Sequence, residues 1–350
     1  MNKLLLCIAF ILLSYLNLYA QKVYKFELAP VKVKISNSLY NSLTVLNYPH
    51  DTTSMGSIYE GIMDTYKKVV AATPISAQFK TLFNSAIDST AANGKLLLQI
   101  TRLLFAERQN QLTDDAFFNL RANLYSQIGG HYQMIATIDT LVVKRSLNPG
   151  KETLKLGNEI MTDFIIKNLS VKSLGRAYTY TYTYYDILNI SEVEKRDIAL
   201  YRTAEYTDGL YLTYRAFSKQ MPDRQIIVDS TDDVNTGRIS TIEGDGVTKK
   251  VKAENVYAIV FRGHPYVVSE GIYYPLKKVN NDFFFVGKAR LSILPGSELA
   301  ADIAGSSASG FLFNLPTATY QMEIDYKNGI FLRLKKIDDV KAKPAEKKDN

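Results

Sequence analysis

The stretch KLLLQITRLLFAE, residues 95–107, has apolar side chains on both of the faces that an extended chain presents. One face would carry the alternate residues Leu96, Leu98, Ile100, Arg102 and Leu104. The other face is also largely apolar, and a strand of this kind is buried on both sides. We therefore expect this stretch to lie in the interior of a sheet.

A hairpin signal follows this strand directly. The runs DAFFNLRANLYSQ (115–127) and HYQMIATIDTLVV (131–143) are separated by Ile128-Gly129-Gly130, which predicts two paired antiparallel strands. Elsewhere in this region the residue pattern predicts helices over 75–92 and 151–169, a strand over 43–48 and strand structure interrupted at Pro30 over 23–35. The order of strands, helix, three strands and helix predicts an α+β domain over residues 21–170.

Turn-forming residues recur at short intervals from residue 200 onward. Asp208-Gly209, Pro222-Asp223 and Asn328-Gly329 are examples, and short β-prone runs lie between such turns. This pattern predicts a mostly antiparallel β domain over residues 200–334, so the chain as a whole is expected to be α+β. We interpret 171–199 as a linker with a Tyr/Thr strand, 299–313 as a helix or loop of small residues, and 335–350 as a disordered charged tail.

The first twenty residues, MNKLLLCIAFILLSYLNLYA, have the pattern of a secretory signal peptide. Lys3 supplies the positive start, an apolar run follows, and Ala20 is the small residue expected at a cleavage site. The apolar run is shorter than the roughly 20 residues that a membrane-spanning helix needs. We therefore expect removal of residues 1–20, no transmembrane anchor in the mature chain, and export to the periplasm, the cell envelope or the medium.

Cys7, the only cysteine, lies inside this apolar run and follows three leucines. A lipid-attachment cysteine there would leave an apolar run of only three residues, against the usual 7–15. We interpret Cys7 as an ordinary apolar residue of the removed segment. The mature chain would then contain no disulfide, no thiol nucleophile and no thiolate metal site.

The formal net charge of +7 does not indicate a nucleic-acid partner, because the basic residues are not concentrated in one compact part of the chain. Nearly half of the residues are apolar, as in a globular protein. The mild positive balance favours solubility and loose attraction to anionic surfaces.

The segment GRAYTYTYTYYD (175–186) alternates tyrosine and threonine. As a strand it would place a row of tyrosines on one face, namely Tyr178, Tyr180, Tyr182 and Tyr184. Such a row is a possible binding surface for sugars or single-stranded nucleic acid. The alternative is an amphipathic strand that links the domains, because tyrosine and threonine are simply good strand formers.

The sequence contains no recognisable catalytic or metal-binding motif. His50, His131 and His264 do not share a ligand spacing, and the serines of GSSASG (305–310) do not form a nucleophile elbow. The loop DSTDDVNTG (229–237) lacks the glycine and the final acidic residue of a calcium loop. We therefore expect no cofactor and no metal, although paired carboxylates from distant parts of the chain are not excluded.

Two resemblances bear on localisation. The segment TVLNYPHDTTSMGSIYEG, helix 75–92, the strand LLLQITRLLFAE, the hairpin and the closing helix together resemble auxiliary lipoproteins of Gram-negative ABC-type transport and organic-solvent resistance systems. This resemblance covers 21–170, implies no catalytic residue, and departs from the family in lacking the lipid-attachment motif. The later segment TDGLYLTYRAFSKQMPD (207–223) is similar to uncharacterised exported proteins of Gram-negative bacteria, which implies localisation only.

The sequence thus favours a non-enzymatic periplasmic or envelope protein that binds another protein or an envelope component. A hydrolase acting on a glycan or peptide and a glycan-binding module remain alternatives. The sequence indicates neither the partner nor an oligomeric state.

Overall fold

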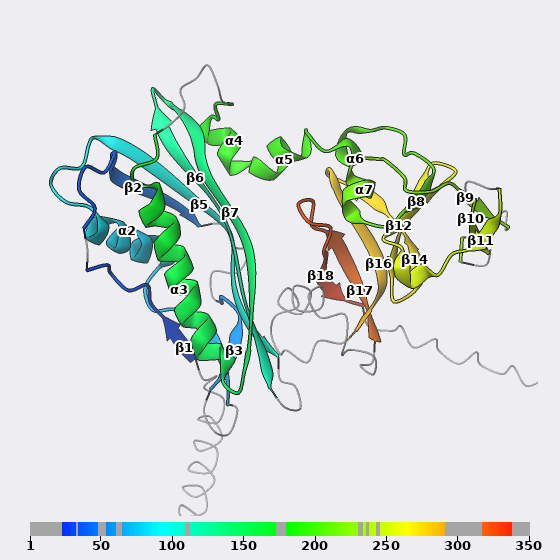
Figure 1. Cartoon of the computed structure of the whole chain (residues 1–350), viewed down its shortest axis with the longest axis horizontal. Helices are drawn as coiled ribbons and strands as arrows, with labels where there is room; N and C mark the ends of the chain where they lie inside the picture. The colour runs from blue at the N-terminus through cyan, green and yellow to red at the C-terminus, as the bar shows by residue number, and fades with distance from the viewer. Residues whose placement is uncertain are drawn as a thin grey trace, which may run out of the picture. The chain divides into compact units, whose positions relative to one another are not determined.

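The computed structural model describes residues 23–32, 34–47, 54–60, 65–108, 113–172, 180–229, 234–235, 238–242, 246–290 and 317–337. The chain divides into two compact units, Met1–Ile187 and Leu188–Asn350 (Figure 1). The fold is α+β with mostly antiparallel sheets, which confirms the predicted fold class. The expected signal peptide, the small-residue segment 299–313 and residues 338–350 lie outside the described residues.

The main sheet of the first unit has the strand order β2-β5-β6-β7. Its strands are β2 (Tyr40–Asn47), β5 (Gly94–Arg108), β6 (Asp114–Ile128) and β7 (His131–Ser146). β2 runs parallel to β5, whereas β5, β6 and β7 are successively antiparallel. The interior position of β5 and the hairpin of β6 with β7 are therefore both as predicted.

A β-bulge in β5 changes which residues share a face. The register with β6 shifts between Ile100 and Arg102. Ile100 and Leu103 consequently belong to the hydrophobic core, while Arg102 lies opposite Arg121 on the other face. The prediction that Arg102 and Leu104 share a face with Ile100 is wrong, because strict alternation does not anticipate the extra residue.

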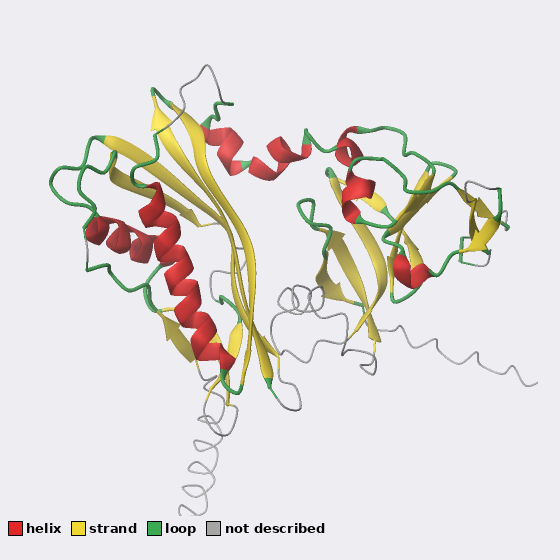
Figure 2. Ribbon diagram, in the orientation of Figure 1, coloured by secondary structure: helices red, strands yellow, loops and turns green. Residues whose placement is uncertain are grey.

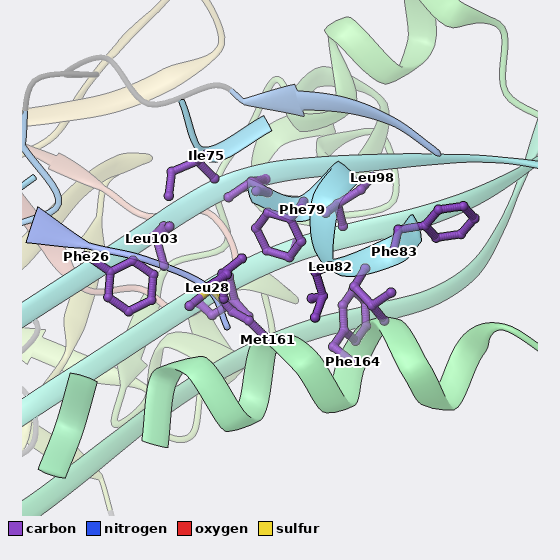
Figure 3. Close-up of a cluster of buried hydrophobic side chains, with 14 of the residues drawn as sticks. Phe26, Leu28, Ile75, Phe79, Leu82, Phe83, Leu98, Leu103, Met161 and Phe164 are labelled. Carbon is purple, nitrogen blue, oxygen red and sulfur yellow. The ribbon is translucent and has the colours of Figure 1, made fainter. Parts of the chain in front are cut away.

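Helices α2 (Ile75–Ala86) and α3 (Pro149–Asn168) pack on one face of this sheet (Figure 2). Figure 3 shows side chains of this core, among them Phe79, Leu82 and Met161, which lie between the helices and the strands. Burying one such large side chain contributes about 2 kcal/mol. Gly157 allows close approach of α3, because a Cβ there would lie 2.7 Å from the ring of Phe105.

Helix α2 is shorter than the predicted range of 75–92. Ile87 is extended and pairs with Ile35 in an isolated β-bridge. Beyond it, the carboxylate of Asp88 accepts hydrogen bonds from the backbone N–H of Thr90 and from its hydroxyl. A short polar side chain that bonds its own backbone in this way favours a turn over a helix.

A second sheet of the first unit, with the order β1-β4-β3, was not fully predicted. Its strands are β1 (Val23–Phe26), β3 (Ser57–Glu60) and β4 (Thr65–Ala71). β1 pairs with β4 in parallel, so its hydrogen bonds connect segments far apart in the chain. The second half of the predicted strand structure over 23–35 is reduced to the single bridge at Ile35.

The second unit is mainly antiparallel β, as predicted. Its sheets have the orders β14-β13-β12-β8, β15-β16-β17-β18 and β11-β10-β9. The elements are α5 (Ile190–Lys195), α6 (Ala199–Arg202), β8 (Gly209–Tyr211), α7 (Tyr214–Ser218), β9 (Ile226–Val228), β10 (Ile239–Ile242), β11 (Thr248–Lys250), η1 (Ala253–Asn255), β12 (Ala258–Phe261), β13 (His264–Ser269), β14 (Ile272–Pro275), β15 (Lys277–Val279), β16 (Asp282–Arg290), β17 (Thr317–Ile324) and β18 (Phe331–Lys336). Because β18 ends at Lys336, the first two residues of the expected tail belong to a strand.

A buried lysine fastens α5 to the second unit. The side chain of Lys195 is 2% exposed, and its Nζ donates hydrogen bonds to Glu192 and to Asp282 at the start of β16. The ammonium also lies 5.6 Å from the ring centre of Tyr201 and 5.5 Å from that of Tyr326. A buried charge needs such partners, so this arrangement fixes α5 against the sheet.

None of the helices that the structure describes has the length and hydropathy needed to cross a bilayer.

Candidate functional site

The strand predicted over 175–186 is not formed in the described part of this segment, where Tyr182 makes an isolated β-bridge and helix α4 (Tyr184–Leu188) begins two residues later. Thr183 and Asp186 form a reciprocal cap at its start. The carboxylate of Asp186 accepts from the backbone N–H of Thr183 at 2.9 Å, and the Thr183 hydroxyl accepts from the Asp186 N–H at 3.1 Å. This is a capping box, which stabilises the first turn of a helix over an extended chain.

We expect Thr183→Val to lower the free energy of unfolding of the first unit by about 1 kcal/mol, because it removes the hydroxyl from this cap. Urea denaturation followed by tyrosine fluorescence checks this. Thr181→Val is the matched control, since Thr181 lies outside the cap and the change in side chain is the same. Equal losses for the two variants would show that the cap does not define the start of α4.

Tyr182 is held against the main sheet by its own backbone. Its N–H and C=O exchange two hydrogen bonds with Tyr132 of β7, each 2.8 Å long. Its ring packs edge-on against buried Tyr125 at 5.6 Å. The segment that contains Tyr182 therefore has a defined position on the sheet.

A buried glutamine connects this segment to α4. Gln99 of β5 accepts a hydrogen bond from the hydroxyl of Tyr125 at 3.1 Å. Its Nε2 donates to the backbone C=O of Ile187 at 2.6 Å. Leu97, Tyr125 and Ile187 form a small apolar cluster beneath. These contacts order both ends of the segment 182–187.

The tyrosine side chains on and beside this anchor form a group that we call the tyrosine patch. It consists of Tyr132, Tyr180, Tyr182, Tyr184 and Tyr185. Tyr180, Tyr184 and Tyr185 are 57%, 45% and 72% exposed, whereas Tyr182 is partly buried. Tyr178, the remaining residue of the expected row, lies outside the described residues.

The rings of the patch do not form one flat row. Tyr180 and Tyr182 have ring centres 4.7 Å apart and planes at 70°. Tyr132 and Tyr184 have centres 6.3 Å apart and planes at 44°. Exposed tyrosine offers apolar ring area together with a hydroxyl that donates or accepts a hydrogen bond. The patch is therefore suited to binding an uneven surface rather than to stacking a series of flat rings.

The other candidate residues from the sequence have ordinary structural positions. His131 follows the Gly129-Gly130 turn at the start of β7, and exposed His264 begins β13; His50 lies outside the described residues. In the loop 229–237, the Asn235 amide is bonded to the backbone N–H and C=O of Tyr273. Across the described ranges, no three His, Cys, Asp or Glu side chains are placed to hold a metal ion.

No protein-family model and no curated protein matches this chain. Among solved structures, one similar protein comes from Xanthomonas campestris and is described by the family model DUF330. It is 12% identical, with a TM-score of 0.26, over 51% of this chain and 98% of its own. A second, described as an uncharacterized protein, is 11% identical, with a TM-score of 0.25, over 42% of this chain and 96% of its own.

Proposed function

We propose that this chain is a non-enzymatic protein of the periplasm or cell envelope that binds another protein through the tyrosine patch. The observation that carries the proposal is the combination of exposed rings with an ordered base. Tyr185 and Tyr180 are more than half exposed, and the neighbouring Tyr182 is fixed by two backbone hydrogen bonds to β7.

The residue type supports a protein partner. Tyrosine is enriched among the few interface residues that carry most of the binding energy, because one ring buries a large area and loses little conformational freedom. Contiguous exposed apolar area on a soluble protein marks an interaction site more often than isolated exposed residues do. The rings of exposed Tyr180 and Tyr184 contact those of Tyr182 and Tyr132, whose backbones are bonded to each other. Exposed Tyr185 follows Tyr184 directly in the sequence.

The order of the base supports binding as well. Segments that must become ordered on binding lose affinity, and a pre-ordered segment avoids that cost. The capping box and the Gln99 contacts hold the start and the end of α4 before any partner arrives. The tilted rings favour a protein surface over a glycan, whose sugar rings stack best on exposed flat faces.

The proposed location in the periplasm or cell envelope depends on the first twenty residues, which have the pattern of a signal peptide. Sequencing the N-terminus of protein isolated from producing cells, together with cell fractionation, tests this part. We expect the mature chain to begin at Gln21 and to be found outside the cytoplasm. A full-length chain in the cytosol would contradict it.

In-cell photo-crosslinking tests the patch. A benzoylphenylalanine replaces Tyr185 in one strain and Met221 in another; Met221 is 65% exposed and lies in the second unit, outside the patch. We expect a reproducible protein adduct from position 185 but not from 221, and its yield should fall about tenfold when Tyr180→Ala is added.

The crosslinking and a separate glycan-array assay distinguish the alternatives. Adducts that are equal from both positions, or absent from 185, would contradict the proposal. If the purified protein binds to a glycan array and the Tyr180→Ala variant does not, the partner of the patch is a glycan and not a protein.

A further inference from the structure

The outer edge of β7 is the strongest unexplained feature of the first unit. β7 is the last strand of its sheet and runs from His131 to Ser146. Among the described residues, only Tyr182 pairs with its outer edge, and it does so at Tyr132. A long edge strand with unpaired N–H and C=O groups is a template for another strand, and folded proteins normally cover or interrupt it.

The second half of this edge is accessible. Val143 is 43% exposed, the side chain of Arg145 is 60% exposed and that of Asp139 is 38% exposed. These odd-numbered residues lie on the sheet face away from α2 and α3, since Ile138 packs into the helix-covered core and side chains alternate along a strand. Along this face, acidic Asp139 is followed by apolar Leu141 and Val143 and then by basic Arg145.

The order of these residues makes the strand complementary to itself. In an antiparallel pair of two β7 strands centred on Val142, Asp139 lies opposite Arg145 of the second copy, and Leu141 lies opposite Val143 of the second copy. Each pair occurs twice because of the two-fold symmetry. Opposite charges and apolar pairs directly across two strands are both favourable.

The existing ion pairs extend this complementarity. Asp139 accepts from the Nε of Arg121 at 2.9 Å through one carboxylate oxygen, and Arg145 donates from its Nε to buried Asp115 at 2.6 Å. In the pair of strands, Asp115 and Arg145 of one copy would be followed by Asp139 and Arg121 of the second copy, so negative and positive charges would alternate. Arg145 uses its Nε and one Nη for Asp115, and Asp139 uses one of its two carboxylate oxygens for Arg121, so Arg145 and Asp139 each have capacity for a second partner.

The proposed pairing and the bridge between Tyr132 and Tyr182 use different parts of β7. Centred on Val142, the pairing uses residues 138–146 and ends where β7 ends. The bridge between Tyr132 and Tyr182 lies before this range and stays in place. We propose that two copies of this chain associate through antiparallel pairing of their β7 strands about Val142, which joins the two main sheets into one. This inference does not depend on the function proposed for the tyrosine patch.

A cysteine at the symmetry axis tests the register. In a Cys7→Ser background, Val142→Cys places two thiols on directly opposed residues, whose Cα atoms lie about 5 Å apart in an antiparallel pair and within disulfide range. Thr137→Cys in the same background is the control, since its two copies would be about 34 Å apart. After mild oxidation, we expect at least about tenfold more disulfide-linked dimer from Val142→Cys. Equal yields from the two variants would overturn the proposal.

Charge reversal tests the pairing by a second route. The mass of the full chain is measured by light scattering after gel filtration, over a range of concentrations. We expect a dimer for the native chain and an about tenfold weaker dimer for Asp139→Lys and for Arg145→Asp. The double variant Asp139→Arg with Arg145→Asp restores opposite charges across the two strands but places like charges beside Arg121 and Asp115 within each copy, so it should recover part of the association.

The controls separate association from folding. Lys155→Glu changes charge on α3, where the lysine side chain is 82% exposed, and should leave the dimer unchanged. Circular dichroism confirms that each variant is folded. A native chain that remains monomeric at every concentration would overturn the proposal.

Discussion

Replacing Gly56 by alanine should lower the free energy of unfolding of the first unit by about 4 kcal/mol. Gly56 has a φ of 98°, where side chains other than glycine are strained. An added Cβ would also lie 1.8 Å from the backbone oxygen of Phe105, which belongs to the interior strand β5. The backbone of β5 cannot move away without disturbing both of its neighbouring strands.

The position of Gly56 explains why the loss should be large. Its C=O accepts from the N–H of Val69 in β4, and Phe105 donates from its N–H to the C=O of Met55 beside it. Gly56 thus lies where the small sheet meets the main sheet. The strain of a positive φ and the clash with a backbone atom both arise there, so the substitution loosens the junction of two sheets.

Gly130→Ala is the matched control for this prediction. Gly130 has a φ of 82°, but nothing lies within 4 Å of the place where its Cβ would be. The control should cost only the backbone strain, about 1 kcal/mol. Calorimetry of the two variants checks the difference in the transition of the first unit. Similar losses at both glycines would show that the contact with Phe105 is not the cause.

The main sheet could be predicted from sequence because its signals are local. β5 is apolar on both faces, β6 and β7 are joined by a glycine turn, and the helical spacing of α3 is regular. The strands β3 and β4 were missed because TYKKVVA (65–71) has no alternation of apolar and polar residues. Its pairing with β1 depends on contacts across more than 40 residues, which no local pattern reveals.

The candidate site was predicted only in part. The tyrosines at 180, 182 and 184 do lie together, but Tyr182 forms an isolated bridge and Tyr184 begins a helix, so they do not follow one strand. Thr183-Tyr-Tyr-Asp186 has the spacing of a capping box, so the start of α4 was readable from the sequence. The contacts of this segment with Tyr132 and Gln99 could not be predicted from the sequence, because they join residues that only the folded sheet brings together.

Replacing Lys195 by methionine should lower the free energy of unfolding of the second unit by about 2 kcal/mol at neutral pH. Methionine keeps most of the apolar stem and removes the charge. Breaking a buried ion pair from one side commonly costs about 3–5 kcal/mol. The loss should be smaller here, because Glu192 and Asp282 are 41% and 26% exposed and regain water.

Lys327→Met is the matched control. Lys327 also pairs with a carboxylate, that of Glu194 at 2.9 Å, and its ammonium also lies near the ring of Tyr326. Its side chain is 20% exposed, against 2% for Lys195. We therefore expect a loss of about 0.5 kcal/mol or less. Two equal losses would show that burial of Lys195 adds nothing to its ion pairs.

The difference between native chain and Lys195→Met should also depend on pH. Burial opposes ionisation of Glu192, but hydrogen bonds from Lys195 and Asn281 outweigh it and hold the pKa of Glu192 below its usual 4.5. A carboxyl group whose pKa is lowered by folding stabilises the folded state fully above the usual pKa, and this contribution is lost as the pH falls through the lowered value. Because the methionine variant lacks the main partner, its stability should fall less on acidification. Calorimetry from about pH 7 to about pH 3 should show the two proteins converging in the transition of the second unit, whereas a constant difference would mean that Lys195 stabilises the unit through packing and not through charge.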